Sequence, residues 1–372
     1  MSAPDQSEIR QTSSVTFLAD LKSLIECESP TEDLAACEKV IHLAIEIANR
    51  QLPITANLHQ ENGRPVFWWG SQTPKVLLLA HLDTVWPHGS FEPIWQVEDD
   101  VIRGPGVFDM KAGFLQALYA IKNLPGCETD VALVATTDEE VGSQTSRDLI
   151  QRLAKGAEAV LVLESSLDGK VKTARKGTAM YQVTVHGRAA HAGLEPEKGI
   201  NTTVEIARLI LQITGLADSE SGTTVVPTLL QSGTSTNTVP AQATLHLDIR
   251  SFSMAELERV DLAINSLTPT DLGATLEITG GINRPPLEAM ATKELYDKLE
   301  LVAQAIGAPP LGHAAVGGAS DGNFAAAVGA KTLDGLGAVG AGAHADHEHV
   351  LLSTIAPRIE LLTAFIKELI RD

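Results

Sequence analysis

Three short apolar runs, separated by stretches with helical periodicity, constrain the fold of this chain most strongly. The runs are residues 76–80, 131–137 and 159–163, and the helical stretches between them lie near 111–124 and 144–153. A continuous apolar run of strand length indicates a strand buried on both faces. Strands that alternate with helices form a mostly parallel sheet flanked by helices. We therefore predict an α/β domain built on such a sheet.

A different pattern begins after residue 176. Residues 177–283 contain alternating segments such as "AMYQVTVHG" and "QATLHLDIRS", with helical stretches at 199–214 and 254–267. Alternation is typical of a sheet with one covered face. The first pattern then resumes, and a chain of 372 residues is long for one core. We predict one domain from 1–176 and 284–372, with an inserted α+β domain at 177–283.

Two side chains are candidate helix caps. Residues 17–51 have a helical pattern, in which Thr31 precedes an acidic first turn. Asp321, which ends the glycine-rich "GGASDG", is expected to cap the short helix after it.

The charge balance argues against two classes of partner. Lys and Arg total 28 against 47 Asp and Glu, a formal charge of -19 that would repel phosphate backbones and anionic membranes. No run approaches the roughly 18 apolar residues of a membrane helix. We expect neither a nucleic acid nor a membrane partner.

Two features favour a cytoplasmic location. The first 17 residues, "MSAPDQSEIRQTSSVTF", lack a basic segment followed by an apolar core. Cys27, Cys37 and Cys127 show no metal or redox spacing, which suits free thiols in a reducing compartment. We expect these cysteines to act as small buried apolar residues.

Imidazole or carboxylate side chains follow each apolar run. Open α/β sheets bind ligands beyond the carboxyl ends of their strands, so these positions matter. The residues are His81 and Asp83 after the first run, Asp138, Glu139 and Glu140 after the second, and Glu164 after the third. The three adjacent acids after the second run would repel one another unless they are solvated or gather a cation. One acid can also bind a metal ion while its neighbour transfers a proton.

Two loops offer further candidate ligands. Asp109 lies in "GPGVFDMKAG" directly before a helix, where an N-cap is the alternative interpretation. The segment "GAGAHADHEHVLL" contains His344, His347 and His349 beside Asp346 and Glu348, and spacing alone does not choose among the three histidines.

The candidate ligands contain imidazoles and carboxylates but no cysteine. That mixture suits Zn²⁺, Co²⁺ or Mn²⁺ with positions open to water, whereas structural zinc usually takes thiolates. More than four ligands would suit two ions about 3.5 to 4 Å apart that share a carboxylate and a water.

Six motifs occur in a characteristic order: "HLDTV", "GPGVFDMKAG", "TTDEEVGS", "LVLESS", "GRAAHAG" and "GAHADHEHV". Together they resemble the dinuclear zinc peptidases and amidohydrolases that include glutamate carboxypeptidase, acetylornithine deacetylase, succinyl-diaminopimelate desuccinylase and aminoacylase. The resemblance covers essentially the whole chain, and Ala112, where the family often has glycine, is a mild departure. "HLDTV", "TTDEEVGS" and "NRPP" are most similar to the glutamate carboxypeptidase branch.

The resemblance implies two divalent metal ions per chain, with zinc preferred and cobalt or manganese as alternatives. Asp109 would be the bridging ligand. His81 and Glu164 would complete the site of one ion, and Glu140 and His344 that of the other.

The resemblance also implies roles in catalysis and substrate binding. Glu139 would be the general base, and Asp83 would orient His81. His191 would stabilise the oxyanion in the active site of the partner subunit. The substrate contacts would be Asn237 near the oxyanion, and Arg250 and Arg284 at a substrate carboxylate, although an ordinary ion pair is the alternative for both arginines.

We predict a homodimeric metal-dependent hydrolase that pairs through its inserted lid domain. It would cleave an amide bond next to a free carboxylate, in a short peptide, an N-acyl amino acid or a glutamyl conjugate. The alternatives are an N-acyl amino acid deacylase and a non-catalytic peptide-binding relative. A dinucleotide enzyme rests only on "GLGAVG", residues 335–340, which opens no helix before about Leu352.

Overall fold

The computed structural model describes residues 6–371 and divides them into two compact units. Unit 1 consists of the described chain up to Ala174, of Ala289–Val316 and of the chain from Ser320 onward. Unit 2 consists of Arg175–Glu288 and Gly317–Ala319, so the predicted insertion limits, 177–283, fall within it. The first five residues of the segment used to predict the compartment lie outside the described residues.

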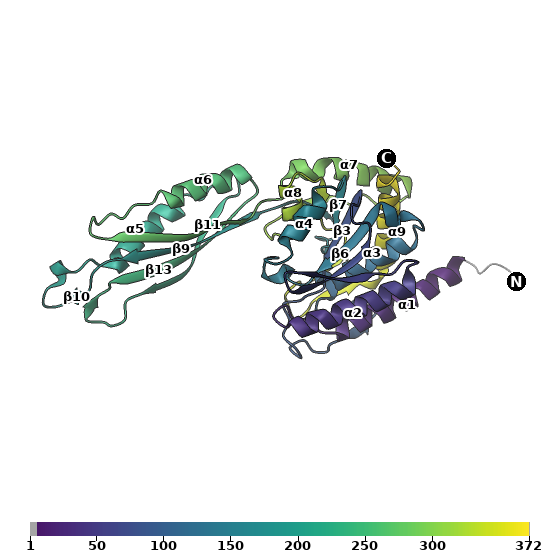
Figure 1. Cartoon of the computed structure of the whole chain (residues 1–372), viewed down its shortest axis with the longest axis horizontal. Coiled ribbons are helices and arrows are strands. Elements are labelled where there is room, and N and C mark those ends of the chain that lie inside the picture. The colour runs from purple at the N-terminus through teal and green to yellow at the C-terminus, as the bar shows by residue number, and fades with distance from the viewer. Residues whose placement is uncertain (1–5, 372) are drawn as a thin grey trace. The chain divides into compact units, whose positions relative to one another are not determined.

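A six-stranded sheet forms the centre of unit 1 (Figure 1). Its strands are β1 Asn57–Glu61, β2 Arg64–Gly70, β3 Val76–His81, β6 Val131–Thr136, β7 Ala159–Val162 and β16 Thr332–Leu333. They lie in the order β1-β2-β6-β3-β7-β16, and the last four are mutually parallel. The β1–β2 hairpin joins β6 in antiparallel pairing, so the predicted mostly parallel sheet is confirmed.

Helices cover both faces of this sheet. They are α1 Gln6–Glu26, α2 Leu34–Gln51, α3 Ala112–Lys122, α4 Arg147–Ala154, α7 Ala289–Ala305, α8 Asp321–Ala327 and α9 Leu352–Leu369. Leu78 of β3 packs in the larger core with α1, α2, α3, α7 and α9, whereas its neighbours Leu77 and Leu79 pack in a second core with α4 and α8. Side chains that alternate between two apolar layers explain the continuous apolar runs.

Short strands complete unit 1. They are β4 Gln96–Glu98, β5 Val101–Arg103, β17 Gly340–Ala341 and β18 His349–Leu351 in one sheet, and β8 Val171–Arg175 with β15 His313–Val316 in another. The pairing of β18 with β5 ties the histidine-rich loop to the segment before Asp109.

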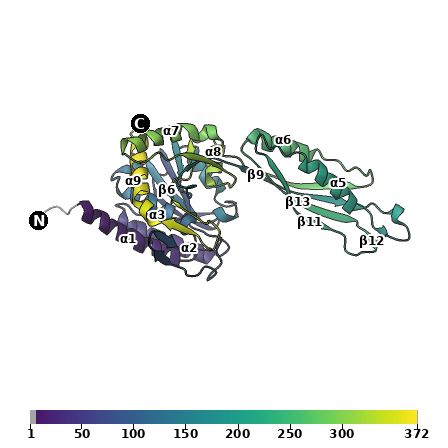
Figure 2. The ribbon, with the colours of Figure 1, turned by 180° about the vertical axis from the view of Figure 1, so that it is seen from behind.

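Unit 2 is an antiparallel sheet with helices on one face (Figure 2). Its elements are β9 Gly177–His186, β10 Ala190–His191, α5 Thr202–Thr214, β11 Thr224–Ser232, β12 Thr238–Val239, β13 Gln242–Ser251, α6 Met254–Asn265 and β14 Thr275–Arg284. The main sheet has the order β11-β13-β9-β14, and β13 alternates between buried and less buried residues. Apolar residues of α5 and α6 share one core with the sheet, as the alternating pattern predicts.

Both predicted caps are wrong. Asp33 caps α2 by accepting a hydrogen bond from the N–H of Ala36, while Thr31 instead donates to Asp83. Ser320 caps α8, and the buried carboxylate of Asp321 accepts hydrogen bonds from Thr136 and Ser143. In each case the polar side chain that the local pattern predicts as a cap instead forms a hydrogen bond with a residue distant in the sequence.

All three cysteines are buried, as predicted. Burial raises the pKa of Cys37 to about 12 and that of Cys127 to about 11, so both are neutral thiols at ordinary pH. Among the helices of residues 6–371, none combines the length and apolarity needed to cross a membrane.

Candidate metal centre

The parallel strands of unit 1 bring three of the predicted segments to one edge of the sheet. His81, the last residue of β3, is in register with Thr136, the last residue of β6, and Leu79 is in register with Val162 at the end of β7. Glu139 and Glu140 therefore leave the sheet on one side of His81, and Glu164 leaves it on the other. The parallel pairing of β6, β3 and β7 is therefore sufficient to bring these segments together.

Asp109 lies between two histidines that are 263 residues apart in the sequence. Its Oδ1 is 3.3 Å from Nε2 of His81, and its Oδ2 is 3.4 Å from Nε2 of His344. Gly106 permits the turn before it, because its φ is +70° and a Cβ atom at this position would clash with the methyl group of Thr84. The two carboxylate oxygens of Asp109 thus face two separate imidazoles.

Each imidazole also meets a second carboxylate. Nε2 of His81 is 3.6 Å from Oε1 of Glu164, and Nε2 of His344 is 3.0 Å from Oε2 of Glu140. The ligand atoms of His81, Asp109 and Glu140 lie within 4.8 Å of one another. The structure therefore brings all five residues predicted as ligands into one cluster.

Glu139 belongs to the same cluster. It forms a second group with His81 and Glu164, again with ligand atoms within 4.8 Å of one another. Geometry alone therefore allows Glu139 either to bind a cation or to exchange a proton beside one.

The cluster strongly perturbs the pKa values of its members. Burial lowers the pKa of His81, but hydrogen bonds to Asp109, Asp83 and Glu164 outweigh it and raise that pKa well above its usual value. Hydrogen bonds to Asp109 and Glu140 raise the pKa of His344 to about 10. The pKa of Asp109 falls despite burial, because both histidines stabilise its charged form. Protons on the imidazoles thus hold together carboxylates that would otherwise repel one another.

Asp83 supports His81 from behind. Nδ1 of His81 is 3.1 Å from the backbone oxygen of Asp83 and 3.4 Å from its Oδ1. The other oxygen, Oδ2, accepts hydrogen bonds from the Thr31 hydroxyl and the Glu140 N–H. Asp83 is fully buried and therefore fixes the ring of His81 relative to the segment that carries Glu140.

Glu348 is a supporting residue that sequence analysis missed. Its fully buried carboxylate accepts hydrogen bonds from the backbone N–H groups of Gly106, Phe108 and Asp109, and from the indole of Trp86. These donors belong to the loops that carry Asp109 and follow His81, while Glu348 itself follows His344. One carboxylate therefore joins three ligand-bearing segments. In the sequence, Glu348 is marked only by its position between two histidines, a pattern that is also typical of a solvated loop.

The donor set suits divalent cations. Five carboxylates, those of Asp83, Asp109, Glu139, Glu140 and Glu164, outnumber the cationic groups even if both imidazoles are protonated and Lys172, 3.8 Å from Glu164, is included. Oε1 of Glu140, a member of this cluster, is buried without a hydrogen-bond partner. An excess of buried negative charge is costly unless a cation compensates it, so the residues fit such a group.

His191 and Asn237 lie together in unit 2. The β10–β12 ladder pairs His191 with Thr238, and the Ala192 N–H donates to the Asn237 carbonyl. Nδ1 of the exposed His191 accepts hydrogen bonds from the N–H groups of Gly193 and Leu194. A neutral ring held in this way carries its proton on Nε2 and presents a donor there.

The two candidate arginines differ in their surroundings. Arg250 forms a bidentate ion pair with Asp248, with distances of 2.9 and 3.0 Å, and donates to the Gly317 carbonyl. Arg284 is buried at the end of β14. The ordinary ion pair considered from the sequence is therefore present at Arg250.

The glycine-rich "GLGAVG" segment opens no helix in unit 1. It leads into β17 and the histidine-rich loop, and α9 begins only at Leu352. A Cβ atom on Gly337 would clash with the Leu163 carbonyl, next to Glu164. The glycine permits close packing beside a candidate ligand, which explains the motif without a dinucleotide.

Residues 77–368 match the family described as Peptidase family M20/M25/M40. Since this match spans most of the chain, the protein belongs to that family. It is 33% identical over 310 residues to carboxypeptidase G2 of Pseudomonas sp. (strain RS-16), covering 79% of this chain and 74% of that relative. It is 24% identical over 378 residues to a succinyl-diaminopimelate desuccinylase of Thioalkalivibrio sulfidiphilus (strain HL-EbGR7), covering 94% and 97% of the two chains.

Solved structures show the same fold. Aminopeptidase PepT from Bacillus cereus ATCC 10987 superposes with a TM-score of 0.79 at 22% identity, over 96% of this chain and 99% of that one. A tripeptidase from Staphylococcus aureus gives a TM-score of 0.76 at 19% identity, with the same coverage.

The family predicted from the six motifs is confirmed. The protein is a metal-dependent amide hydrolase of the M20/M25/M40 peptidase family and uses divalent metal ions.

Proposed function

We propose that the protein holds two divalent ions, with zinc preferred over cobalt or manganese, and cleaves an amide bond next to a free carboxylate. The observation that carries this proposal is the position of Asp109, whose two oxygens each face a different imidazole. Asp109, His81 and Glu164 would hold one ion. Asp109, Glu140 and His344 would hold the other. A mixture of imidazoles and carboxylates suits these metals when water must also bind.

Bound divalent ions would supply acidification of a water molecule and polarisation of the scissile carbonyl. Glu139 accepts the proton of the attacking water and delivers it to the leaving nitrogen. Its place in one group with His81 and Glu164 supports this role. Asp83 keeps the Nδ1 proton on His81 and so leaves Nε2 available as a ligand.

The proposed substrate is a peptide, an N-acyl amino acid or a glutamyl conjugate that ends in a free carboxylate. Asn237, Arg250 and Arg284 are its proposed contacts, since a guanidinium matches a carboxylate in shape and charge. The 33% identity to carboxypeptidase G2 favours a carboxypeptidase. Similarity to desuccinylases supports an N-acyl amino acid deacylase as the second candidate.

A homodimer that pairs through unit 2 is the proposed assembly. Strand β11 lies at the edge of its sheet, and Leu229 and Leu230 on it are about half exposed, at 49% and 48%. An unpaired edge with apolar side chains is suited to association. Across such a dimer, the Nε2–H of His191 would stabilise the oxyanion in the partner subunit.

We also propose a cytoplasmic location. Three buried cysteines, with no disulfide within the described residues, suit a reducing compartment.

A substrate panel tests the proposed function. Purified protein, supplied with Zn²⁺, Co²⁺ or Mn²⁺, would be assayed on N-acetyl and N-succinyl amino acids, dipeptides and glutamyl conjugates. The proposal predicts metal-dependent release of an amino acid with a free carboxylate. Lack of hydrolysis of every class with all three metals would contradict it.

A further inference from the structure

The segment that carries Glu139 and Glu140 turns sharply after β6. Residues Glu139–Val141 form a single 3₁₀ turn, which ends on Gly142 at a φ of +91°. Ser143 follows with a φ of +52°, in the left-handed region that is unfavourable for residues other than glycine. Such a backbone persists only where surrounding contacts hold it in place, so residues outside the turn must fix its position.

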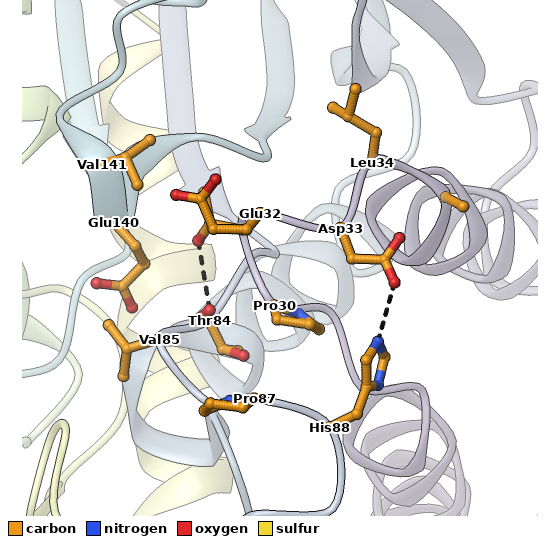
Figure 3. Close-up of a pocket in the computed structure, with 12 residues that line it drawn as sticks. Pro30, Glu32, Asp33, Leu34, Thr84, Val85, Pro87, His88, Glu140 and Val141 are labelled. Carbon is orange, nitrogen blue, oxygen red and sulfur yellow. Dashed lines mark hydrogen bonds and ion pairs between the residues drawn. The ribbon is translucent and has the colours of Figure 1, made fainter.

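One side of the turn faces an open hollow of about 800 Å³ within unit 1. Figure 3 shows Glu140 and Val141 on one wall of this hollow and Leu34 on the other, and Val85 also lines it. Val141 is 37% exposed, whereas Ser143, just after the turn, is fully buried. The position of the turn therefore depends on contacts at its buried base and not on packing at the hollow.

The buried carboxylate of Asp321 binds both ends of this segment. Its Oδ2 accepts a hydrogen bond of 3.3 Å from the hydroxyl of Thr136, the last residue of β6. Its Oδ1 accepts a hydrogen bond from the hydroxyl of Ser143. The three side chains are at most 4% exposed, and all belong to unit 1. Because Thr136 precedes the turn and Ser143 follows it, one carboxylate joins the two ends across the base.

Asp321 is itself held by contacts that do not involve the turn. It is the first residue of α8, where Ser320 and Asn323 form a capping box. Ser320 also donates a hydrogen bond to the buried carboxylate of Asp334. Phe324 of the same helix is 1% exposed and lies in the core that includes α4. Helix α8 therefore presents Asp321 to the turn as a fixed acceptor.

Asp138, the first of the three acids after β6, makes different contacts. Its carboxylate accepts hydrogen bonds of 2.6 to 3.1 Å from the N–H of Thr145 and from the N–H and hydroxyl of Ser146, directly before α4. Among the described residues, Asp138 belongs to neither ligand group. Asp138 thus links the turn forward to α4, whereas Asp321 links it back to the end of β6.

We infer that Asp321 is a positioning residue, which holds the turn so that Glu139 faces the metal cluster. The inference rests on the proposed function, in which Glu139 is the general base. Glu140 has a second support, because its N–H donates a hydrogen bond to Asp83. Loss of the Asp321 contacts should therefore impair proton transfer more than metal binding.

Two variants remove one contact from opposite sides. Asp321→Asn keeps the size of the side chain but loses one of its two acceptor oxygens, and Ser143→Ala removes a hydroxyl that binds it. With saturating metal, kcat and kcat/KM of each should fall together by about 10- to 100-fold, because a misplacement of about 1 Å can cost that much. The double variant should lose no more than Asp321→Asn alone, since both changes remove the same contact.

Metal affinity distinguishes a positioning residue from a part of the metal site. Chelator competition with Co²⁺ measures the dissociation constant of each variant. This constant should rise by a smaller factor than that by which kcat falls, because Asp83 still binds the Glu140 N–H. A larger effect on Co²⁺ affinity than on kcat would overturn the inference.

Hydrogen–deuterium exchange of the metal-free protein tests the turn itself. Residues 137–146 should exchange about fivefold faster or more in Asp321→Asn than in the wild type, because the turn opens more often. Asp20→Asn is the control, since it alters another buried carboxylate of unit 1, which binds the hydroxyl of Tyr119 and belongs to neither ligand group. It should change neither this exchange nor kcat.

The outcomes separate this inference from the proposed function. Unchanged exchange in the Asp321 variant, or wild-type kcat in both variants while Glu139→Ala is inactive, would overturn the inference and leave the proposed function intact. Normal turnover by Glu139→Ala would overturn the proposed base and the inference with it. Circular dichroism establishes folding, and if Asp321→Asn does not fold, Ser143→Ala alone provides the same kinetic and exchange measurements.

Discussion

The two units of the molecule accommodate their polar residues in opposite ways. In unit 1, His81, Asp83 and Glu164 are at most 7% exposed at the ends of parallel strands, and they meet residues from distant segments. In unit 2, Arg250 pairs with Asp248 two residues away, and His191 binds the turn that follows it. Unit 1 thus concentrates charge that its own side chains do not neutralise, whereas Arg250 and His191 of unit 2 each have partners within three residues in the sequence.

This difference teaches where chemistry can be located. A parallel sheet collects the ends of several strands at one edge, so separate segments contribute to one cluster. Under the proposed function, metal binding and proton transfer belong to unit 1, and the oxyanion and carboxylate contacts to unit 2.

The largest expected effect is the loss of turnover in Glu139→Ala. General acid–base catalysis contributes about 10² to 10⁴ to the rate, so kcat should fall by that factor. Metal content, measured by mass spectrometry of the dialysed protein, should not change. Glu158→Ala, an exposed acid of the same unit, is the control. Normal hydrolysis by the Glu139 variant would show that Glu139 is not the residue that transfers the proton.

The next effect concerns metal affinity in Glu348→Gln. The amide cannot accept all four hydrogen bonds that position the ligand-bearing loops, so the metal dissociation constant should rise about 10- to 100-fold. Chelator competition with Co²⁺ measures it, and the absorption spectrum of bound Co²⁺ reports any change in geometry.

Two further variants control the Glu348 experiment. Asp346→Asn alters a side chain that is 99% exposed on the same loop and should have no effect. Trp86→Phe removes one of the four donors and should weaken binding less than Glu348→Gln does. Unchanged affinity and spectra in a folded Glu348 variant would show that the loops do not depend on this carboxylate.

Metal affinity should also depend on pH. Interactions with Asp109 and Glu140 raise the pKa of His344 to about 10, so a metal ion must displace its proton. Affinity should therefore fall as pH falls below about 10, by roughly tenfold per unit for each proton displaced. Co²⁺ titrations at several pH values measure this slope, and a flat profile would contradict the proton-bridged cluster.

The same shift has the opposite consequence for the metal-free protein. Because the folded pKa of His344 lies above its unfolded value, its contribution to stability is fully present below an unfolded pKa of about 6.5. That contribution is lost as pH rises through about 10. Thermal unfolding of the metal-free protein against pH checks this sign.

The smallest effect tests the role of unit 2. A mixture of His191→Ala and Glu139→Ala proteins, each nearly inactive, should regain up to about a quarter of wild-type activity, because half of the dimers would be hybrids with one intact site. Size-exclusion chromatography with light scattering establishes the dimer. If hybrid dimers form without regaining activity, His191 does not act across subunits.

The sequence predicted the parts of the site that follow strand order. His81, Glu140 and Glu164 end apolar runs, and parallel pairing alone brings such positions together. It did not predict that Thr31 supports Asp83 or that Glu348 binds the Asp109 loop, which lies about 240 residues earlier. Those contacts depend on how loops fold back over the sheet, for which hydrophobic periodicity contains no information.

The hollow beside Glu140 was also beyond sequence analysis. Leu34 and Val85 are ordinary apolar residues in the sequence, and only the fold leaves them exposed around one concavity. The shape of this hollow therefore requires the structure, whereas the class of enzyme did not.

Metal stoichiometry tests the central claim most directly. Wild-type protein saturated with Zn²⁺ and dialysed should retain about two ions per chain, as a shared carboxylate between two sites requires. Asp109→Ala should lose affinity for both proposed ions, because one oxygen of Asp109 faces His81 and the other faces His344. Retention of no zinc by the folded wild-type protein, or of two ions by the variant, would contradict the account.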